Sequence, residues 1–262
     1  MTTYKDIGVT KAANFVGQIE IQRPPHNFFD MALIQQIATA MEEFDKDDGV
    51  RAVVLCAQGK SFCAGANFND PGRQEQSTTV GGSPTNHLYQ EAVRLLRTKK
   101  PIIAAVHGAA IGGGLGVACA ADFRVTCPEA RFAANFTRLG FHPGFGLTVL
   151  LTELVGKNQA ELLFYTGRRI GGEEATRIGL ANVCVPQDQV RAEATKLAAE
   201  IAESAPLAII STRKTMRGTL ADRVKAATDH ELKEQTWLRG TEDFKEGVKA
   251  TNERRVANWK GR

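Results

Sequence analysis

Two segments of small residues, each directly after an apolar, strand-like run, limit the folds open to this chain. Residues 61–67 follow the run 51–57, and residues 107–116 follow the run 101–106. Short apolar runs with β-branched residues are typical of strands buried on both faces of a parallel sheet. Small residues let a ligand approach the backbone closely. We therefore expect an α/β fold with a ligand site at the carboxyl ends of these two strands.

Strand and helix patterns alternate through most of the chain. Residues 15–22 alternate apolar and polar, and Asp30 is placed to cap a helix with apolar positions at helical spacing. Gly, Pro, Ser and Thr predict a loop over 67–85. Further strands are expected at 123–126, 131–134 and 182–185, and further helices at 86–98, 112–121, 147–155, 158–166, from 171, 190–203, 206–216, 220–238 and after a capping Thr241. We thus predict a core of β-β-α units over 1–204 and a helical region over 205–262, which is a lid or an oligomer contact.

Composition narrows the functional classes. Apolar residues make up 43% and charged residues 24% of the 262, as is ordinary for a soluble globular protein. The longest apolar stretch, 101–121, is rich in Gly and Ala and is interrupted by His107, and no signal-peptide core follows the polar residues 1–6. The net charge of +4 is spread without a basic stripe. We expect a cytoplasmic protein that binds neither membrane nor nucleic acid, and a small anionic ligand suits the diffuse charge.

The five cysteines, an odd number, have spacings that fit neither a metal site nor a redox CxxC pair. Most of them stand in apolar stretches, so we interpret them as buried, reduced thiols. Cys63 lies in the first small-residue segment, and a reactive thiol there is the alternative. No cluster of side chains has metal-ligand spacing, so we expect no metal.

The glycines at 112–114 are expected at the start of a helix. The first N–H groups of a helix have no partner inside the helix, and its positive dipole end favours a developing negative charge. Close packing of a helix on a strand also selects Gly and Ala, and this remains an alternative. The spacing does not match a dinucleotide-binding GxGxxG fingerprint.

Taken together, FCAGAN (62–67) and GAAIGGGLG (108–116) resemble the crotonase (enoyl-CoA hydratase/isomerase) superfamily. The resemblance extends to Arg23-Pro24 with Asn27, to GFHPG (140–144), to TGRRI (166–170), to the segment 174–181 and to EDFKEG (242–247). It implies a spiral core of repeated β-β-α units and an enzyme, a lyase or isomerase of fatty acid metabolism, that acts on acyl-CoA thioesters. It also implies a homotrimer or a hexamer built from two trimers, with coenzyme A present only as part of the substrate and no permanently bound cofactor.

The resemblance also assigns roles to residues. The backbone N–H groups of Ala66 and Gly113 would form an oxyanion hole at the thioester carbonyl, where one donor is typically worth ~3–4 kcal/mol of barrier. The remaining candidates would line the coenzyme A and the acyl group: Pro25, Asn27, Ala64, Asn67, Phe68, Ala110, Asn135, Phe136, Phe244 and Lys260. For Lys260, simple solvent exposure is the alternative.

The chain departs from the family pattern where the proton chemistry is expected. Hydratases of this family use two glutamates, and their positions are Gly116 and Phe136 here, neither of which can accept a proton. Hydration and double-bond isomerisation by the usual mechanism are therefore not expected. The aryl-CoA dehalogenase branch needs an Asp nucleophile at the position of Gly144, which excludes that activity too.

Other residues are candidates to replace the missing acids. Tyr89 and His142 are the first candidates, with Asn135 and His87 behind them, although each could be an ordinary packed or solvated residue. With Tyr89 or His142 the chain could be an acyl-CoA hydrolase or a C–C lyase. Without a replacement it would be a catalytically weak acyl-CoA-binding homologue.

Overall fold

The chain builds a six-stranded sheet that continues into a smaller one. A computed structural model describes residues 2–67, 78–80, 83–85 and 87–262. The large sheet has the order β1 (Ile7–Lys11), β2 (Val16–Ile21), β3 (Ala52–Ala57), β7 (Ile102–Val106), β9 (Phe123–Thr126) and β12 (Val183–Cys184). Its pairs are parallel except β1 with β2. Every residue of β3 and β7 is buried, which confirms the prediction for these two apolar runs.

The smaller sheet explains the predicted repeat. Its order is β11 (Arg169–Ile170), β10 (Arg131–Ala133), β8 (Ala109–Ile111) and β4 (Ser61–Cys63). β3 leads into β4, β7 into β8 and β9 into β10, so each central strand of the large sheet is followed by one of the small sheet. Helices follow these strand pairs, and the predicted α/β fold with repeated β-β-α units is confirmed.

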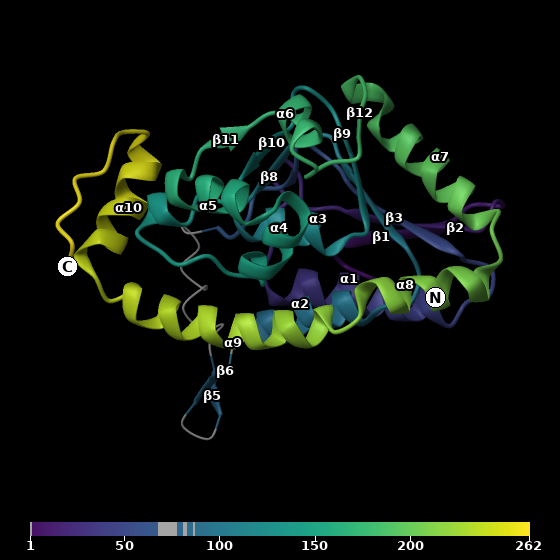
Figure 1. The fold of residues 1–262 in the computed structure, drawn as a ribbon, viewed down its shortest axis with the longest axis horizontal. Helices are drawn as coiled ribbons and strands as arrows, with labels where there is room; N and C mark the ends of the chain where they lie inside the picture. Colours follow the sequence, from purple (N-terminus) through teal and green to yellow (C-terminus); the bar gives the residue numbers. More distant parts are fainter. Residues whose placement is uncertain (1, 68–77, 81–82, 86) are drawn as a thin grey trace.

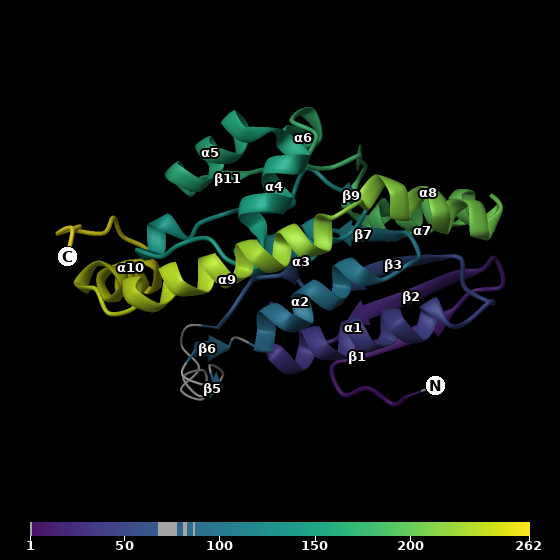
Figure 2. The ribbon, with the colours of Figure 1, turned by 60° about the horizontal axis from the view of Figure 1, so that its bottom comes forward.

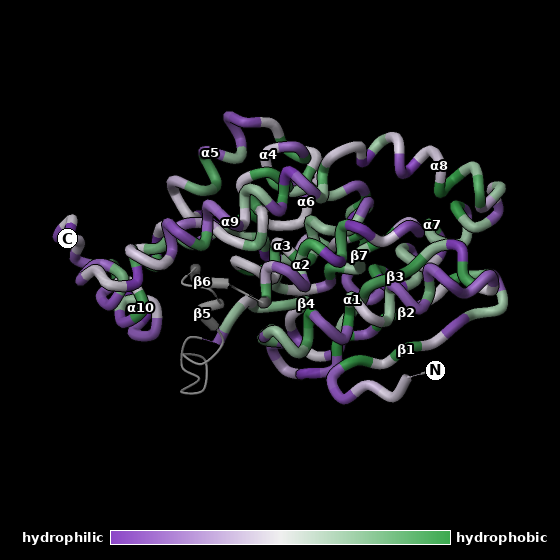
Figure 3. Tube along the Cα trace, turned by 90° about the horizontal axis from the view of Figure 1, so that it is seen from below, coloured by the Kyte–Doolittle hydropathy of each residue, from purple (hydrophilic) through white to green (hydrophobic). Residues whose placement is uncertain are grey.

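Helices cover both faces of the large sheet (Figure 1), with α7 packed along β3 and β7. Asp30 accepts a hydrogen bond from the Leu33 N–H at 2.9 Å, and Thr241 accepts one from Phe244 at 3.1 Å, so both predicted caps are confirmed. The helices are α1 (Met31–Asp45), α2 (His87–Arg97), α3 (Gly113–Ala120), α4 (Leu147–Val155), α5 (Lys157–Thr166), α6 (Gly172–Arg177), α7 (Val190–Ala202), α8 (Pro206–Arg217), α9 (Leu220–Leu238) and α10 (Glu242–Glu253). Hydrophobic residues gather around β3 and β7, and hydrophilic ones are frequent on α10 (Figure 3).

The stretch predicted as a loop over 67–85 contains two strands, so that prediction was wrong in part. β5 (Thr78–Val80) pairs with β6 (Ser83–Thr85) in an antiparallel hairpin away from the body of the chain (Figure 1). The Thr and Val residues of β5 have β-branched side chains, which suit extended backbone. Composition alone pointed to a loop because Gly, Ser and Pro dominate the segment.

The helical character predicted for 205–262 is confirmed in α8, α9 and α10, and Figure 2 shows α9 running past α2 and α4 toward α10. Asp122 accepts hydrogen bonds from the Nε atoms of Arg213 and Arg217, at 2.9 Å each, and ties α8 to the core. Glu231 is fully buried and accepts from the Gly146 N–H at 2.8 Å, at the start of α4. The Glu231 contact fixes α9, which reaches the site described next. Among the described residues, no helix has the length and apolar character to cross a membrane.

Candidate functional site

The two small-residue segments meet at one cavity of about 460 Å³, called the central cavity here. Its lining includes the loop after β4, the start of α3, residues of the segment 135–145, and Tyr89 from α2. Gln235 and Arg239 of α9 complete it on a further side. The cavity therefore lies at the ends of β4 and β8, as predicted from the two segments.

Two backbone N–H groups on the wall of this cavity are free to bind an oxygen atom. They belong to Ala66 and Gly113, and neither donates to a protein acceptor in the described part of the chain. The two loops touch, because a Cβ atom built on Gly65 would lie 2.6 Å from the Ile111 carbonyl oxygen. Gly65 has φ +83 and Gly112 has φ +55, a conformation that favours glycine. Gly113 is the first residue of α3, where the helix leaves N–H groups unpaired.

The glycines here also serve close packing, the alternative left open above. A Cβ on Gly114 would lie 2.0 Å from the Cys63 carbonyl oxygen, so α3 rests directly on β4. A Cβ on Gly113 would lie 2.3 Å from the ring of Phe29. Packing thus fixes where the Gly113 N–H lies.

Aromatic rings lie at Gly116 and Phe136, the two positions where the sequence was predicted to lack acids. Phe145 is 2% exposed, and its Cδ1 would lie 2.5 Å from a Cβ atom on Gly116. No larger side chain fits at Gly116 unless Phe145 moves. Phe136 is itself buried and lines the cavity, and the Phe29 and Phe145 rings lie 5.7 Å apart. This part of the wall is apolar and offers no proton acceptor.

Tyr89 brings a phenol to the cavity. Its hydroxyl donates to Oε1 of Gln235 at 2.8 Å, and Nε2 of Gln235 donates to the His142 carbonyl at 3.0 Å. A Cβ on Gly144 would lie 2.1 Å from the Tyr89 hydroxyl oxygen, so no larger residue fits there, an aspartate included. Burial, followed by the nearby Glu231 carboxylate, raises the pKa of Tyr89. The phenol therefore stays protonated at neutral pH.

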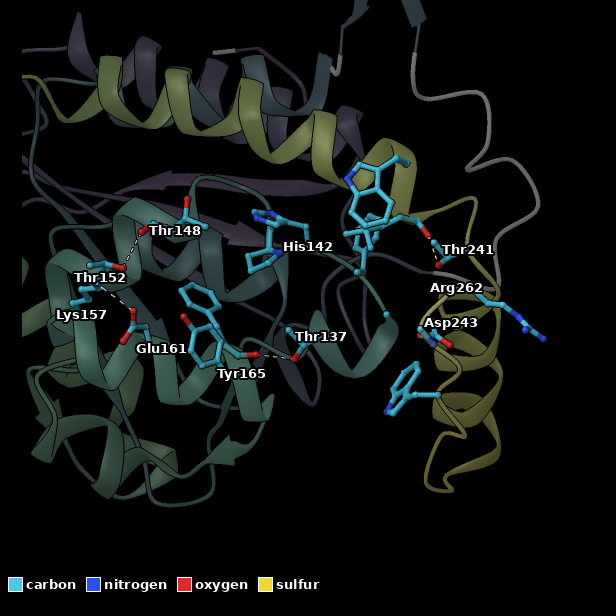
Figure 4. Close-up of a pocket in the computed structure, with 18 residues that line it drawn as sticks. Thr137, His142, Thr148, Thr152, Lys157, Glu161, Tyr165, Thr241, Asp243 and Arg262 are labelled. Carbon is cyan, nitrogen blue, oxygen red and sulfur yellow. Dashed lines mark hydrogen bonds and ion pairs between the residues drawn. The ribbon is translucent and has the colours of Figure 1, made fainter.

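His142 does not join Tyr89 at the central cavity. Its side chain lines a second cavity of about 930 Å³, shown in Figure 4, with residues of α4, α5 and the C-terminal segment. Its Nδ1 lies 2.8 Å from the Pro143 carbonyl oxygen, and its ring lies edge-on to His230 with centroids 5.9 Å apart. The backbone carbonyl of His142 accepts from Gln235, but His142 is not among the residues that line the central cavity.

Most of the residues predicted to contact coenzyme A or the acyl group fall into two groups. Ala64, Asn67, Asn135 and Phe136 line the central cavity. Asn27, Pro25 and Ala110 do not line it. Asn27 is fully buried and donates to the carbonyls of Gln58 and Ser61, at 2.6 and 2.7 Å, so it holds the backbone around β4. Pro25 accepts from the Lys60 N–H at 2.9 Å, and Ala110 is fully buried in β8.

The C-terminal candidates lie away from the cavity of this single chain. The Phe244 ring packs on Phe141 with centroids 5.1 Å apart. Lys260 is exposed and its Nζ pairs with Glu242 at 3.1 Å, which agrees with the alternative of simple solvent exposure. Phe68 lies outside the described residues, and so does the side chain of His87.

The cysteines are buried as predicted, apart from Cys184, which is half-buried. Burial raises the pKa of the Cys63 thiol to about 12, which argues against a reactive thiolate there.

Sequence reasoning missed the contribution of α9. Gln235 and Arg239 are four residues apart and thus share one helix face, but nothing local indicated which face meets the cavity. Arg131 and Arg169, from β10 and β11, were missed as well. Among the described residues that line the cavity there is no carboxylate, and the charged ones are arginines.

The chain is similar to known proteins over nearly its whole length. A family model described as enoyl-CoA hydratase/isomerase matches residues 11–262. A short-chain-enoyl-CoA hydratase of Clostridium acetobutylicum is 34% identical over 244 residues, which is 92% of each chain. A crotonyl-CoA hydratase of Syntrophomonas wolfei is 33% identical over 91% of this chain and 92% of its own. The crystal structure of an enoyl-CoA hydratase/isomerase from Pseudoalteromonas atlantica T6c superposes with a TM-score of 0.84 at 29% identity, over 98% of this chain and 100% of that one.

Proposed function

Because this chain belongs to the enoyl-CoA hydratase/isomerase family, we propose that it processes an acyl-CoA thioester whose carbonyl oxygen lies between the N–H groups of Ala66 and Gly113. One observation carries the proposal: within the described residues, both N–H groups lack a protein acceptor and both stand on the wall of the central cavity. Ala64 and Asn67 would line the coenzyme A beside them. Coenzyme A would enter as part of the substrate, and no other cofactor is proposed.

The proposed catalytic effect is electrostatic. When an enolate or a tetrahedral intermediate forms, negative charge moves onto the thioester oxygen. Donors held in place beforehand need not reorganise, and each is typically worth ~3–4 kcal/mol of barrier. The N-terminal end of α3, which begins at Gly113, adds its positive dipole end.

Tyr89 is the proposed proton donor. Its raised pKa keeps the phenol neutral, so it is suited to give a proton rather than to take one. Gln235 holds the hydroxyl in one orientation. These groups thus support one step, the transfer of the Tyr89 proton to the α carbon of an enolate held at the Ala66 and Gly113 N–H groups, and water then returns a proton to the phenolate. His142 is not part of the proposal, because it lines the second cavity.

A C–C lyase is the second candidate. When a carboxylate on the α carbon leaves as CO2, the electron pair of the broken C–C bond stays on the thioester as the enolate, and the enzyme then has to supply only a proton to that α carbon. Tyr89 offers a neutral phenol, and the described residues that line the central cavity include no carboxylate. This combination favours C–C cleavage over hydration.

An assay with crotonyl-CoA tests our prediction that the chain is not an efficient hydratase. We expect the loss of enoyl absorbance to be at least about a hundred-fold slower than with a glutamate-bearing hydratase assayed in parallel, since each missing acid–base group typically costs 10²–10⁴ in rate. Titration calorimetry with acetyl-CoA should show binding at the same time. Hydration at an ordinary rate would contradict our interpretation of Gly116 and Phe136.

The binding measurement tests the proposed function itself, because the absence of binding at millimolar acetyl-CoA would contradict it. A mass-spectrometric screen of acyl-CoA thioesters then separates the lyase from a protein that only binds.

A homotrimer or hexamer is also proposed, as the resemblance implies. Large aromatic side chains around the second cavity support it: Tyr165 is 72% exposed, Trp237 59% and Trp259 44%. Exposed apolar patches of this kind are typical of protein–protein contacts. We expect sedimentation equilibrium to give three or six times the mass of one chain, whereas a monomer at micromolar concentration would contradict the proposal.

A further inference from the structure

The central cavity carries a positive charge that no described protein group neutralises. Arg239 stands at the C-terminal end of α9, one turn after Gln235, and lines the cavity with Tyr89. Its guanidinium carbon lies 5.2 Å from the centroid of the Phe141 ring. In the part of the chain that the structure describes, no carboxylate pairs with this guanidinium. The residue is exposed in this single chain, and an arginine remains charged at neutral pH.

The other arginines of the cavity differ from Arg239 in their surroundings. Nη1 of Arg131 donates to the carbonyls of Pro128 and Ala130, at 2.9 and 2.7 Å, so it is held by its own turn. Arg169 lies on β11, opposite Ala133 of β10, in the small sheet. Both arginines therefore belong to the sheet side of the cavity, whereas Arg239 belongs to the α9 side with Tyr89.

A series of contacts leads from the Ala66 and Gly113 N–H groups toward Arg239. Gly113 meets the Phe29 ring, and this ring lies against Phe145. Phe145 follows Gly144, which meets Tyr89 and Gln235. An acyl group held at Gly113 would run along this aromatic wall toward Tyr89, and its far end would come to the α9 side.

We propose that the acyl group carries a carboxylate at its far end and that Arg239 binds it. The inference rests on the proposed function and names its substrate class, a CoA thioester of a dicarboxylic acid. Arginine presents a planar fork that matches a carboxylate with two hydrogen bonds. A neutral acyl chain offers the guanidinium no acceptor, so it forgoes these charge-assisted hydrogen bonds.

Matched pairs of ligands test this inference by calorimetry. Glutaryl-CoA is compared with pentanoyl-CoA, and adipoyl-CoA with hexanoyl-CoA, so that only the terminal group changes its charge. We expect at least one carboxylated ligand to bind ~10-fold tighter than its neutral partner. Arg239→Gln should bring that ratio close to one by weakening only the carboxylated ligand, and Arg239→Lys should keep part of it. Arg169→Gln is the matched control and should keep the ratio.

Each other outcome has a defined meaning. Equal affinities within both pairs for the unmodified protein would overturn the inference while leaving the proposed function intact. If Arg239→Gln weakened all four ligands equally, Arg239 would serve a phosphate of coenzyme A, and the inference would be wrong. If none of the four bound, the proposed function would fail and the inference with it. Circular dichroism and thermal melting confirm that each variant is folded.

Discussion

The Gly113→Pro/Phe29→Ala double variant is expected to lose about 10²–10³ in kcat relative to Gly113→Ala/Phe29→Ala, on the thioester that the acyl-CoA screen identifies. Proline deletes the N–H group at the first position of α3, where its ring is otherwise well tolerated. The Phe29→Ala change removes the ring that any Cβ at position 113 would meet at 2.3 Å. Steady-state kinetics of the two double variants measure the effect.

The comparison removes one hydrogen-bond donor while it keeps the packing defect nearly constant. Both double variants carry a Cβ at position 113 and lack the Phe29 ring, so their packing defects are nearly the same. They differ in the N–H group and in the proline ring. Equal kcat values for the two folded variants would mean that Gly113 does not form half of an oxyanion hole.

Tyr89→Phe is expected to lower kcat by about 10²–10⁴ with a smaller change in KM, because a proton donor acts in the transition state. The aromatic ring remains and fills the same space. The pH dependence is a second readout. The active form is the protonated phenol, and its pKa is raised, so activity should persist through pH 10 and fall only at higher pH.

Tyr165→Phe is the matched control for Tyr89→Phe. Tyr165 is 72% exposed on α5 and lies outside the central cavity, so the loss of its hydroxyl should leave kcat unchanged. If Tyr89→Phe kept full activity while its melting temperature fell, the phenol would serve only to brace Gln235. The proton donor would then have to be another group.

The features that the sequence predicted well are those with a local physical cause. The apolar runs of β3 and β7 can only be buried, and both are. Asp30 and Thr241 cap their helices because their side chains reach an N–H group three residues ahead. Ala66 and Gly113 meet at one cavity because each follows a strand of the same small sheet.

What could not be predicted depends on contacts between distant segments. The resemblance predicts that Gly116 stands where hydratases carry an acid, but the sequence does not reveal that the Phe145 ring fills the space beside it. It leaves Tyr89 and His142 as equal candidates, and a hydrogen bond across 146 positions, from Tyr89 to Gln235, separates them. No periodicity reveals which face of α9 meets the core, so Gln235 and Arg239 were not among the candidates.

The spacing of functions along α9 limits how such a chain can diverge. Glu231 caps α4, Gln235 braces Tyr89, and Arg239 stands at the cavity, each four residues after the one before. Each residue of a helix turns it by about 100°. A one-residue insertion or deletion early in α9 would therefore rotate all three side chains away from their partners together. Point substitutions on its outer face carry no such penalty, so relatives with the same site should vary in α9 by replacement and keep its length.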